Sequence, residues 1–138
     1  MQYRAPEVVS IAEGCLGGLR GRSALVIGPE EQRYFYVKLL RRAGMKCVYQ
    51  EDTPYHVSSF LPSIQLLISI PPSSHTAPWV TAASIAEGCN GRRTPLLILD
   101  LARYPSVEDL AGLLPAVCLY TPDDLRRILN KGFSKVNA

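Results

Sequence analysis

The stretch Ser23-Ala24-Leu25-Val26-Ile27-Gly28 decides the fold, because five uncharged and mostly apolar residues run straight into a glycine. A short, continuous apolar run of this kind is typical of a β-strand that is buried on both faces. Helical periodicity flanks the run on both sides, over 6–19 and 30–43, and glycines mark the end of each helix. This part of the chain is therefore predicted to be a buried strand between two helices.

The same alternation continues toward the C-terminus. Further apolar runs predict strands over 46–50, 64–70, 95–100 and 117–120, with helical segments at 79–89, 107–114 and 122–131. The last helix has a clear start, because Thr121 can cap it and Pro122 suits its first position. Strands that alternate with helices predict an α/β fold: a single Rossmann-like domain over 1–138, with a doubly wound parallel sheet of about five strands in the order 2-1-3-4-5. A ligand cleft is expected at the switch point between the first and third strands.

Composition narrows the class of protein. Hydrophobic residues make up 47% of the chain and charged residues 20%, which is typical of a globular domain, and a net charge of +3 does not indicate a nucleic-acid binder. No apolar run is long enough to cross a membrane and no secretory signal is visible, so a cytoplasmic protein is expected. The four cysteines form no CxxC pair, and Cys47 and Cys118 fall inside predicted strands. They are predicted to be buried free thiols, and neither a disulfide framework nor a metal site is expected.

Several motifs follow one another in an order that resembles glutamyl-tRNA reductase, in the nucleotide-binding (Rossmann) region that it shares with shikimate dehydrogenase. Leu19–Gly28 is similar to the family's L-x-G-K-x-V-L-V-I-G, and Leu66–Ile70 corresponds to its VVISST strand. The most specific stretches, 97–105 and 114–125, resemble IDLAVPRDI and LPGVYLYDIDDL. The resemblance covers the chain from Pro6 onward and implies a link to tetrapyrrole (haem) biosynthesis. The family's catalytic and dimerisation domains are expected to be absent, which implies a stand-alone domain without catalytic residues.

The cofactor loop departs from the family's pattern. A dinucleotide site needs G-x-G-x-x-G, with glycines that form a tight turn and let the backbone approach the pyrophosphate. Here the loop reads Gly28-Pro29-Glu30-Glu31-Gln32-Arg33, and only the first glycine is present. Pro29 has no N–H to donate, and Glu30 places a side chain where phosphate would lie. Two glutamates at the helix start oppose the attraction of the helix dipole for anions. The pyrophosphate site is therefore predicted to be lost, which disfavours NADP and NAD.

The end of the second predicted strand also differs from the family. The family has Asn-Arg-Thr/Ser here, and its arginine grips the 2′-phosphate of NADP, whereas this chain has Glu51-Asp52-Thr53. Only Thr53 matches. Glu51 or Asp52 could bond the ribose of NAD and would repel NADP, and a solvated acidic turn is the other interpretation. The segment 52–63 is expected to be too short for the family's helix and edge strand, which removes one wall of the adenosine pocket.

The remaining candidate residues follow the third and fourth strands. Ser69 and Ser73 at the third strand and Asp100 at the fourth are assigned to the same degenerate switch-point cleft. His75 beside Ser73 and Ser74 raises the possibility of a nucleophilic serine, but neighbours in sequence rarely attain the geometry required, and a polar loop is the preferred interpretation. No catalytic or metal-binding residue is assigned.

One group of side chains suggests contact with another molecule. Tyr34, Phe35 and Tyr36 are consecutive on a predicted helix, so they cannot all face the sheet, and an outward ring is compatible with a protein partner or a homodimer. Nucleic-acid binding is not expected. The basic side chains at the ends of elements are interpreted as solvated: Arg20, Arg22, Arg41, Arg42, Lys46, Arg92 and Arg93.

Three functional hypotheses remain open. The leading one is a non-catalytic, reductase-like Rossmann domain that acts as a binding or partner module linked to tetrapyrrole biosynthesis. The second is an NAD(P)-binding oxidoreductase subunit that completes its site with another chain. The third is a binder of a different small molecule, such as a tetrapyrrole intermediate, in the remodelled cleft. In each case catalysis by this chain alone is not expected.

Overall fold

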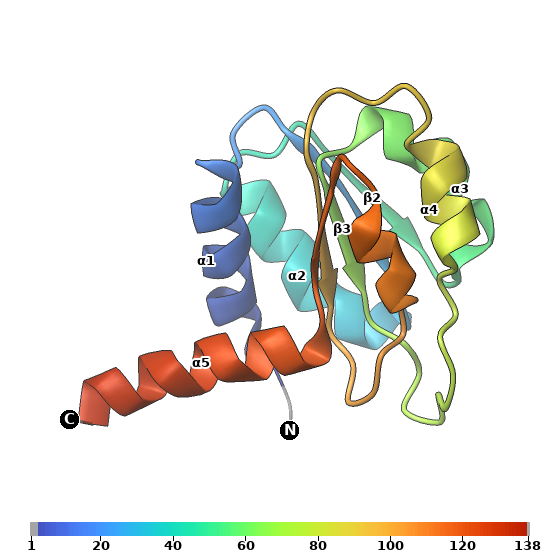
Figure 1. Ribbon diagram of the computed structural model, residues 1–138. Helices are drawn as coiled ribbons and strands as arrows, with labels where there is room; N and C mark the ends of the chain where they lie inside the picture. Colours follow the sequence, from blue (N-terminus) through green and yellow to red (C-terminus); the bar gives the residue numbers. More distant parts are fainter. Residues whose placement is uncertain (1–2, 138) are drawn as a thin grey trace.

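The computed structural model describes residues 3–137, with side chains described as far as residue 130. Its centre is one parallel five-stranded sheet in the order β2-β1-β3-β4-β5, as predicted (Figure 1). The strands are β1 Ser23–Ile27, β2 Cys47–Glu51, β3 Leu66–Ser69, β4 Leu96–Asp100 and β5 Val117–Tyr120. The order reverses between β1 and β3, so the carboxyl ends of these two strands form the switch point of the sheet.

Helices cover both faces of the sheet, which gives three layers (Figure 1). On one side lie α1 and α2, and on the other α3 and α4, while α5 runs past the lower end of α1. Their bounds are α1 Ala5–Leu16, α2 Glu30–Arg42, α3 Val57–Phe60, α4 Ala82–Gly88 and α5 Pro122–Asn137. In the part of the chain that the structure describes, no helix combines the length and apolar character that crossing a membrane requires.

The core lies on both faces of the central strands because successive strand residues point in opposite directions. In β1, Ala24 and Val26 join the cluster under α1 and α2, while Leu25 and Ile27 join the cluster under α3 and α4. All five residues of β1 are buried. Burying a large aliphatic side chain contributes roughly 1.5–3 kcal/mol, so these two apolar layers supply most of the driving force for the fold.

Two cysteines in the edge strands of the sheet are less buried than predicted. β2 and β5 each have a neighbour on one side only, and their residues are mostly half-buried. Cys47 is half-buried in β2, and Cys118 is exposed in β5. An apolar run in sequence does not distinguish a central strand from an edge strand, so the prediction was wrong for these cysteines.

Several element bounds differ from the prediction. α1 ends at Leu16 rather than at residue 19, because Gly17 adopts a left-handed conformation with φ 68°. The segment 52–63, which was expected to be too short for a helix and an edge strand, holds the short helix α3 between two 3-10 helices, and α3 packs against α4. A Cβ on Gly88 of α4 would lie 2.8 Å from Ser58 O of α3 and 2.5 Å from Leu61 Cδ1 in the 3-10 helix that follows, so glycine lets the two helices approach closely.

Two arginines that were interpreted as solvated instead bind backbone carbonyl groups. Arg22 donates to Leu16 O at 2.8 Å and to Gly18 O at 3.0 Å, which satisfies the C-terminal end of α1. Arg92 donates to four backbone carbonyl groups, two in the segment before β3 and two in the segment before β4. Guanidinium groups suit such positions because they carry five N–H donors in a fixed plane.

Candidate functional site

The turn between β1 and α2 contains its glycine for a packing reason. Gly28 has φ +155°, and a Cβ on it would lie 2.4 Å from Ile70 O. Ile70 follows β3 and donates its N–H to Ile27 O at 2.8 Å, while Gly28 N–H donates to Glu51 O at 2.9 Å. The glycine therefore fits where the ends of three strands converge. The sheet itself requires it, whether or not a dinucleotide binds.

The N-terminal end of α2 offers little to an anion. Pro29 stands at the cap position and has no N–H. The backbone N–H groups of Gln32 and Arg33 both donate to Pro29 O, at 3.0 and 3.1 Å. Glu30 and Glu31 place two carboxylates in the first turn, where the positive end of the helix dipole would otherwise attract phosphate. The charge at this helix end thus opposes a pyrophosphate.

The Arg33 side chain packs against the loop between β1 and α2. Its Nη1 donates to Gly28 O at 2.5 Å and to Asp52 Oδ1 at 2.6 Å, and its Nε donates to Gln50 Oε1 at 3.0 Å. The Arg33 side chain is only 12% exposed. One guanidinium therefore joins α2, the loop after β1 and the end of β2. Contacts within the chain occupy the positions where this fold ordinarily holds the phosphates and the ribose.

The acidic residues at the end of β2 also have partners within the chain. Asp52 pairs with Arg33, and Glu51 Oε1 lies 3.1 Å from His56 Nδ1. Thr53 is exposed and makes no capping bond with its side chain at the start of the short helix that follows. Among the side chains that the structure describes, no three His, Cys, Asp or Glu residues gather as a metal site requires.

Ser69 and Asp100 lie side by side at the carboxyl ends of β3 and β4, but they face the interior. Trp79 Nε1 donates to Ser69 Oγ at 2.8 Å, and Ser69 Oγ lies 2.9 Å from Ser106 Oγ. Ser106 Oγ in turn donates to Asp100 Oδ1 at 2.5 Å. Ser69 is fully buried, and Asp100 is 1% exposed. These two predicted cleft residues therefore hold the loops after β3 and β4 together and are closed to a ligand.

The Asp100 carboxyl group has few charges to balance it. Besides Ser106 Oγ, it accepts the backbone N–H groups of Ser106 at 2.8 Å and Val107 at 3.0 Å. Burial raises the pKa of Asp100, and these hydrogen bonds and the nearby His75 oppose the effect only in part. The carboxyl group is thus held by dipoles in the interior.

A hollow at this end of the sheet lies between α1, α2 and the loops after β3 and β4. It has a volume of about 820 Å³ and contains Ser73 alone among the predicted site residues. Apolar and aromatic side chains form much of its lining: Tyr3, Phe35, Tyr36, Leu39, Ile70 and Leu101. We call this hollow the α1–α2 groove. Tyr36 is buried, whereas Phe35 is 62% exposed and Tyr34 is 56% exposed. The tyrosine–phenylalanine run thus does point partly outward.

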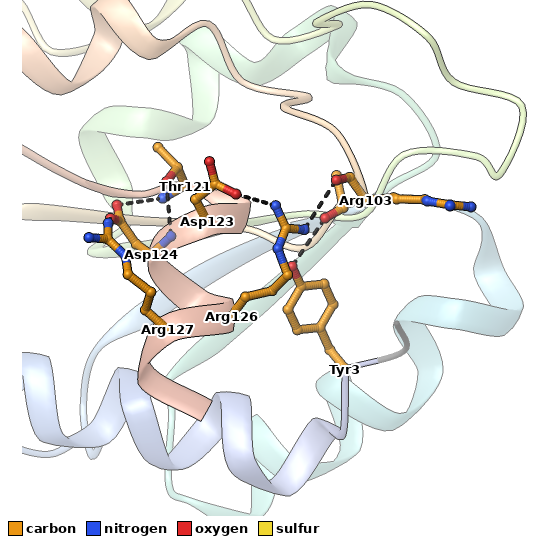
Figure 2. Close-up of polar contacts among 8 residues, drawn as sticks. Tyr3, Arg103, Thr121, Asp123, Asp124, Arg126 and Arg127 are labelled. Atoms are coloured by element: carbon orange, nitrogen blue, oxygen red, sulfur yellow. Dashed lines mark hydrogen bonds and ion pairs between the residues drawn. The ribbon is translucent and has the colours of Figure 1, made fainter. Parts of the chain in front are cut away.

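One wall of the α1–α2 groove is tied to the start of α5 (Figure 2). Tyr3 donates its hydroxyl to Ala102 O at 3.1 Å, and Arg126 Nη1 donates to Arg103 O at 3.2 Å. Thr121 and Asp124 cap α5 reciprocally: Asp124 N–H donates to Thr121 Oγ1, and Thr121 N–H donates to Asp124 Oδ2. The N-terminal segment and α5 therefore meet the same loop from two sides and fix its backbone.

Comparisons with known proteins agree with the motif order. No family model matches the chain. Over 87% of its length it is 28% identical to glutamyl-tRNA reductase from Methanospirillum hungatei and 29% identical to that from Methanosarcina acetivorans. The domain is glutamyl-tRNA reductase-like. It spans about a third of those relatives, 34% and 30% of their respective lengths.

Solved structures support the fold of the reductase-like domain. Glutamyl-tRNA reductase from Methanopyrus kandleri superposes with a TM-score of 0.77 at 22% identity, over 95% of this chain and 37% of that one. A dipicolinate synthase subunit from Bacillus halodurans superposes with a TM-score of 0.67 at 16% identity, over 97% of this chain and 53% of that one. At these identities the likeness concerns the fold.

The predicted site residues lie in three separate places in the structure. Gly28 and Pro29 form the turn before α2, and Glu30 begins that helix. Glu51 ends β2 and Thr53 follows it, while Ser69 ends β3, Ser73 lies in the loop after β3 and Asp100 ends β4. The sequence analysis missed Arg33 as a contact between segments, and it missed Tyr3 and Arg103 in the α1–α2 groove. The position of Arg103, three residues after the end of a predicted strand, was an available signal, because loops at this edge of a parallel sheet line its clefts.

Burial of Asp100 gives a testable pH dependence. Its raised pKa means that the folded protein still binds a proton that the unfolded chain has released above about pH 4. We therefore expect the wild type to lose stability, relative to Asp100→Asn, as pH rises from this point through the raised pKa. Urea unfolding of both proteins between about pH 4 and pH 7 measures the difference. A wild-type advantage that grows with pH over this window contradicts the expectation.

Proposed function

We propose that this chain is a non-catalytic, glutamyl-tRNA reductase-like module that binds a ligand or partner other than a dinucleotide, in the context of tetrapyrrole biosynthesis. The observation that carries the proposal is the Arg33 guanidinium, which bonds Gly28 O and Asp52 within the loop. A dinucleotide would have to displace these contacts. It would also have to approach a helix end that carries two glutamates and a proline.

The link to tetrapyrrole biosynthesis rests on the relatives. They are named glutamyl-tRNA reductase and match most of this chain, although the chain covers about a third of each of them. The non-catalytic role rests on the side chains at the carboxyl edge of the sheet. Ser69 and Asp100 are used in internal hydrogen bonds, and the two acids at the end of β2, Glu51 and Asp52, are paired. Glu30 and Glu31 stand beside the nucleotide position, but their charge opposes the phosphates of a nucleotide.

Isothermal titration calorimetry with NADPH and NADH at millimolar concentration tests the proposal. We expect no saturable heat with either nucleotide, because the loop provides neither a phosphate cradle nor a cation that is free of other contacts. An NADPH-dependent dehydrogenase in the same buffer serves as the positive control. A dissociation constant below about 100 μM, equivalent to roughly 5.5 kcal/mol, overturns the proposal and favours an oxidoreductase subunit.

A loop variant sharpens the same test. Arg33→Ala removes the guanidinium from Gly28 and Asp52 while leaving both glutamates in place. If the wild type binds NADPH and Arg33→Ala does not, Arg33 is a phosphate ligand and the proposed function is wrong. If neither protein binds, the result agrees with a loop whose contacts lie within the chain.

A further inference from the structure

We propose that the α1–α2 groove binds a small molecule with an apolar, ring-containing body and more than one anionic group. This inference rests on the proposed function, since it names the ligand class of a module that does not use the dinucleotide loop. The size of the hollow supports it first. A volume of about 820 Å³ falls within the roughly 300–1,000 Å³ typical of small-molecule sites.

The apolar body is inferred from the lining of the groove. Buried residues from three elements reach it: Tyr36 from α2, Ile70 after β3 and Leu101 after β4, each no more than 7% exposed. Phe35 stands at the wall with 62% of its surface exposed, although removing a large apolar ring from water lowers the free energy. Aromatic lining favours a ligand with rings, because rings pack against one another in stacked or edge-on geometries.

The anionic groups are inferred from the charges at the groove. Its lining includes Arg4, Lys38, Arg42 and Arg103 and a single carboxylate, that of Glu31. This excess of three positive charges equals the net charge of the whole chain. Within the described residues, ion pairs of the groove cations are confined to Arg4, which lies 3.6 Å from Glu7. Lys38, Arg42 and Arg103 are all exposed and remain available to an anion.

The walls of the groove are held in place before any ligand arrives. The loop after β4 is fixed by Tyr3 and Arg126, whose donors bind Ala102 O and Arg103 O (Figure 2). The Ser69–Ser106–Asp100 hydrogen bonds anchor the loops after β3 and β4 from beneath. A hollow with fixed walls binds its ligand at a lower cost in conformational entropy than one that must order on binding.

Fluorescence titration with pyrene tetrasulfonate, a flat ring system with four anionic groups, tests the inference. We expect saturable binding to the full chain, and at least about tenfold weaker binding by pyrene methylammonium, which has the same ring and a positive charge. Phe35→Ser and Arg42→Glu are each expected to weaken binding of the tetrasulfonate by about tenfold. Both substitutions alter exposed side chains, and circular dichroism checks that each variant is folded.

A neighbouring residue provides a matched control. Arg41 lies on the same helix and is exposed, but it does not line the α1–α2 groove. Arg41→Glu is therefore expected to change binding by less than about twofold. Equal losses in the control and groove variants would show that the probe binds the surface of α2 in general, and would overturn the assignment of the groove.

The remaining outcomes separate this inference from the proposed function. Absence of saturable binding by the tetrasulfonate, with no NADPH binding, overturns the groove assignment alone. If a poly-glutamate peptide binds instead, with the same dependence on Phe35 and Arg42, the occupant is an acidic protein segment and the small-molecule inference is wrong. If NADPH below about 100 μM displaces the probe, the proposed function fails while the groove remains the binding site.

Discussion

Replacing Gly28 by alanine is expected to lower the free energy of unfolding by about 3 kcal/mol. The new Cβ would lie 2.4 Å from Ile70 O and 2.8 Å from Ile70 Cβ, and the backbone φ of +155° is unfavourable for any residue with a Cβ. Ile70 cannot easily retreat, because its N–H is bonded to Ile27 O in the adjacent strand. Urea unfolding followed by circular dichroism measures the change.

A second glycine provides the control for this experiment. Gly14 lies inside α1, where a Cβ would have no neighbour within 4 Å. Gly14→Ala is therefore expected to raise stability by roughly 0.5–1 kcal/mol, because alanine favours helix. If Gly28→Ala stays within about 1 kcal/mol of the wild type, the glycine is not required by strand packing. Its presence would then need a ligand-based explanation after all.

The fold was predictable because each strand and helix has a hydrophobic pattern that can be recognised within its own short segment of sequence. Each central strand must be apolar on both faces, so Ser23–Ile27 and 95–100 appear as continuous runs, and the helices between them show helical periodicity. The right-handed crossover of parallel strands limits the possible orders of the sheet. The exposure of Cys118 was not predictable in this way. The exposure of Cys118 depends on whether its strand lies at the edge of the sheet, and the composition of the strand does not indicate its position.

The candidate site was predictable only where the backbone decides it. Pro29 lacks an N–H and Glu30 carries a side chain in any conformation, so the eroded loop could be recognised from sequence. The role of Arg33 could not, because its partners Gly28 and Asp52 come from two other segments and meet it only after the sheet has formed. Ser69 and Asp100 occupy the predicted strand ends, yet their burial depends on Trp79 and Ser106 from later loops.

The contacts of the loop after β1 bear on the proposed ligand site in the α1–α2 groove. In a dinucleotide site of this fold the loop after the first strand leaves backbone N–H groups free for the ligand. Here the Gly28 N–H donates to Glu51 O, and Gly28 O accepts a hydrogen bond from Arg33. The backbone groups of Gly28 at the switch point are therefore paired within the chain. Exposed cations without an ion pair among the described residues, Lys38, Arg42 and Arg103, line the α1–α2 groove, and for this reason we place the proposed ligand site there and not at the loop.

Arg92→Met is the second substitution with a large expected effect, a loss of about 3 kcal/mol in the free energy of unfolding. The guanidinium donates to Leu61 O at 2.7 Å, Ile64 O at 2.6 Å, Thr94 O at 2.7 Å and Pro95 O at 3.1 Å. It thereby joins the segment before β3 to the segment before β4. Methionine preserves the length of the aliphatic stem but removes the four hydrogen bonds that the guanidinium donates.

Arg93 offers the matched control, since it is the next residue, carries the same charge and is exposed. Arg93→Met is expected to change stability by less than about 0.5 kcal/mol. Arg92→Lys is expected to recover less than half of the loss, because an ammonium group cannot span carbonyl groups that lie around a planar fork. Full recovery by lysine would mean that charge alone matters at this position. Equal losses in Arg92→Met and Arg93→Met would contradict the role of these hydrogen bonds.

Urea unfolding of the wild type and the three variants at one pH distinguishes these cases. Hydrogen exchange adds a local measurement. In Arg92→Met we expect the segment between β2 and β3 to lose protection first, because the carbonyl groups of Leu61 and Ile64 lose the hydrogen bonds from Arg92.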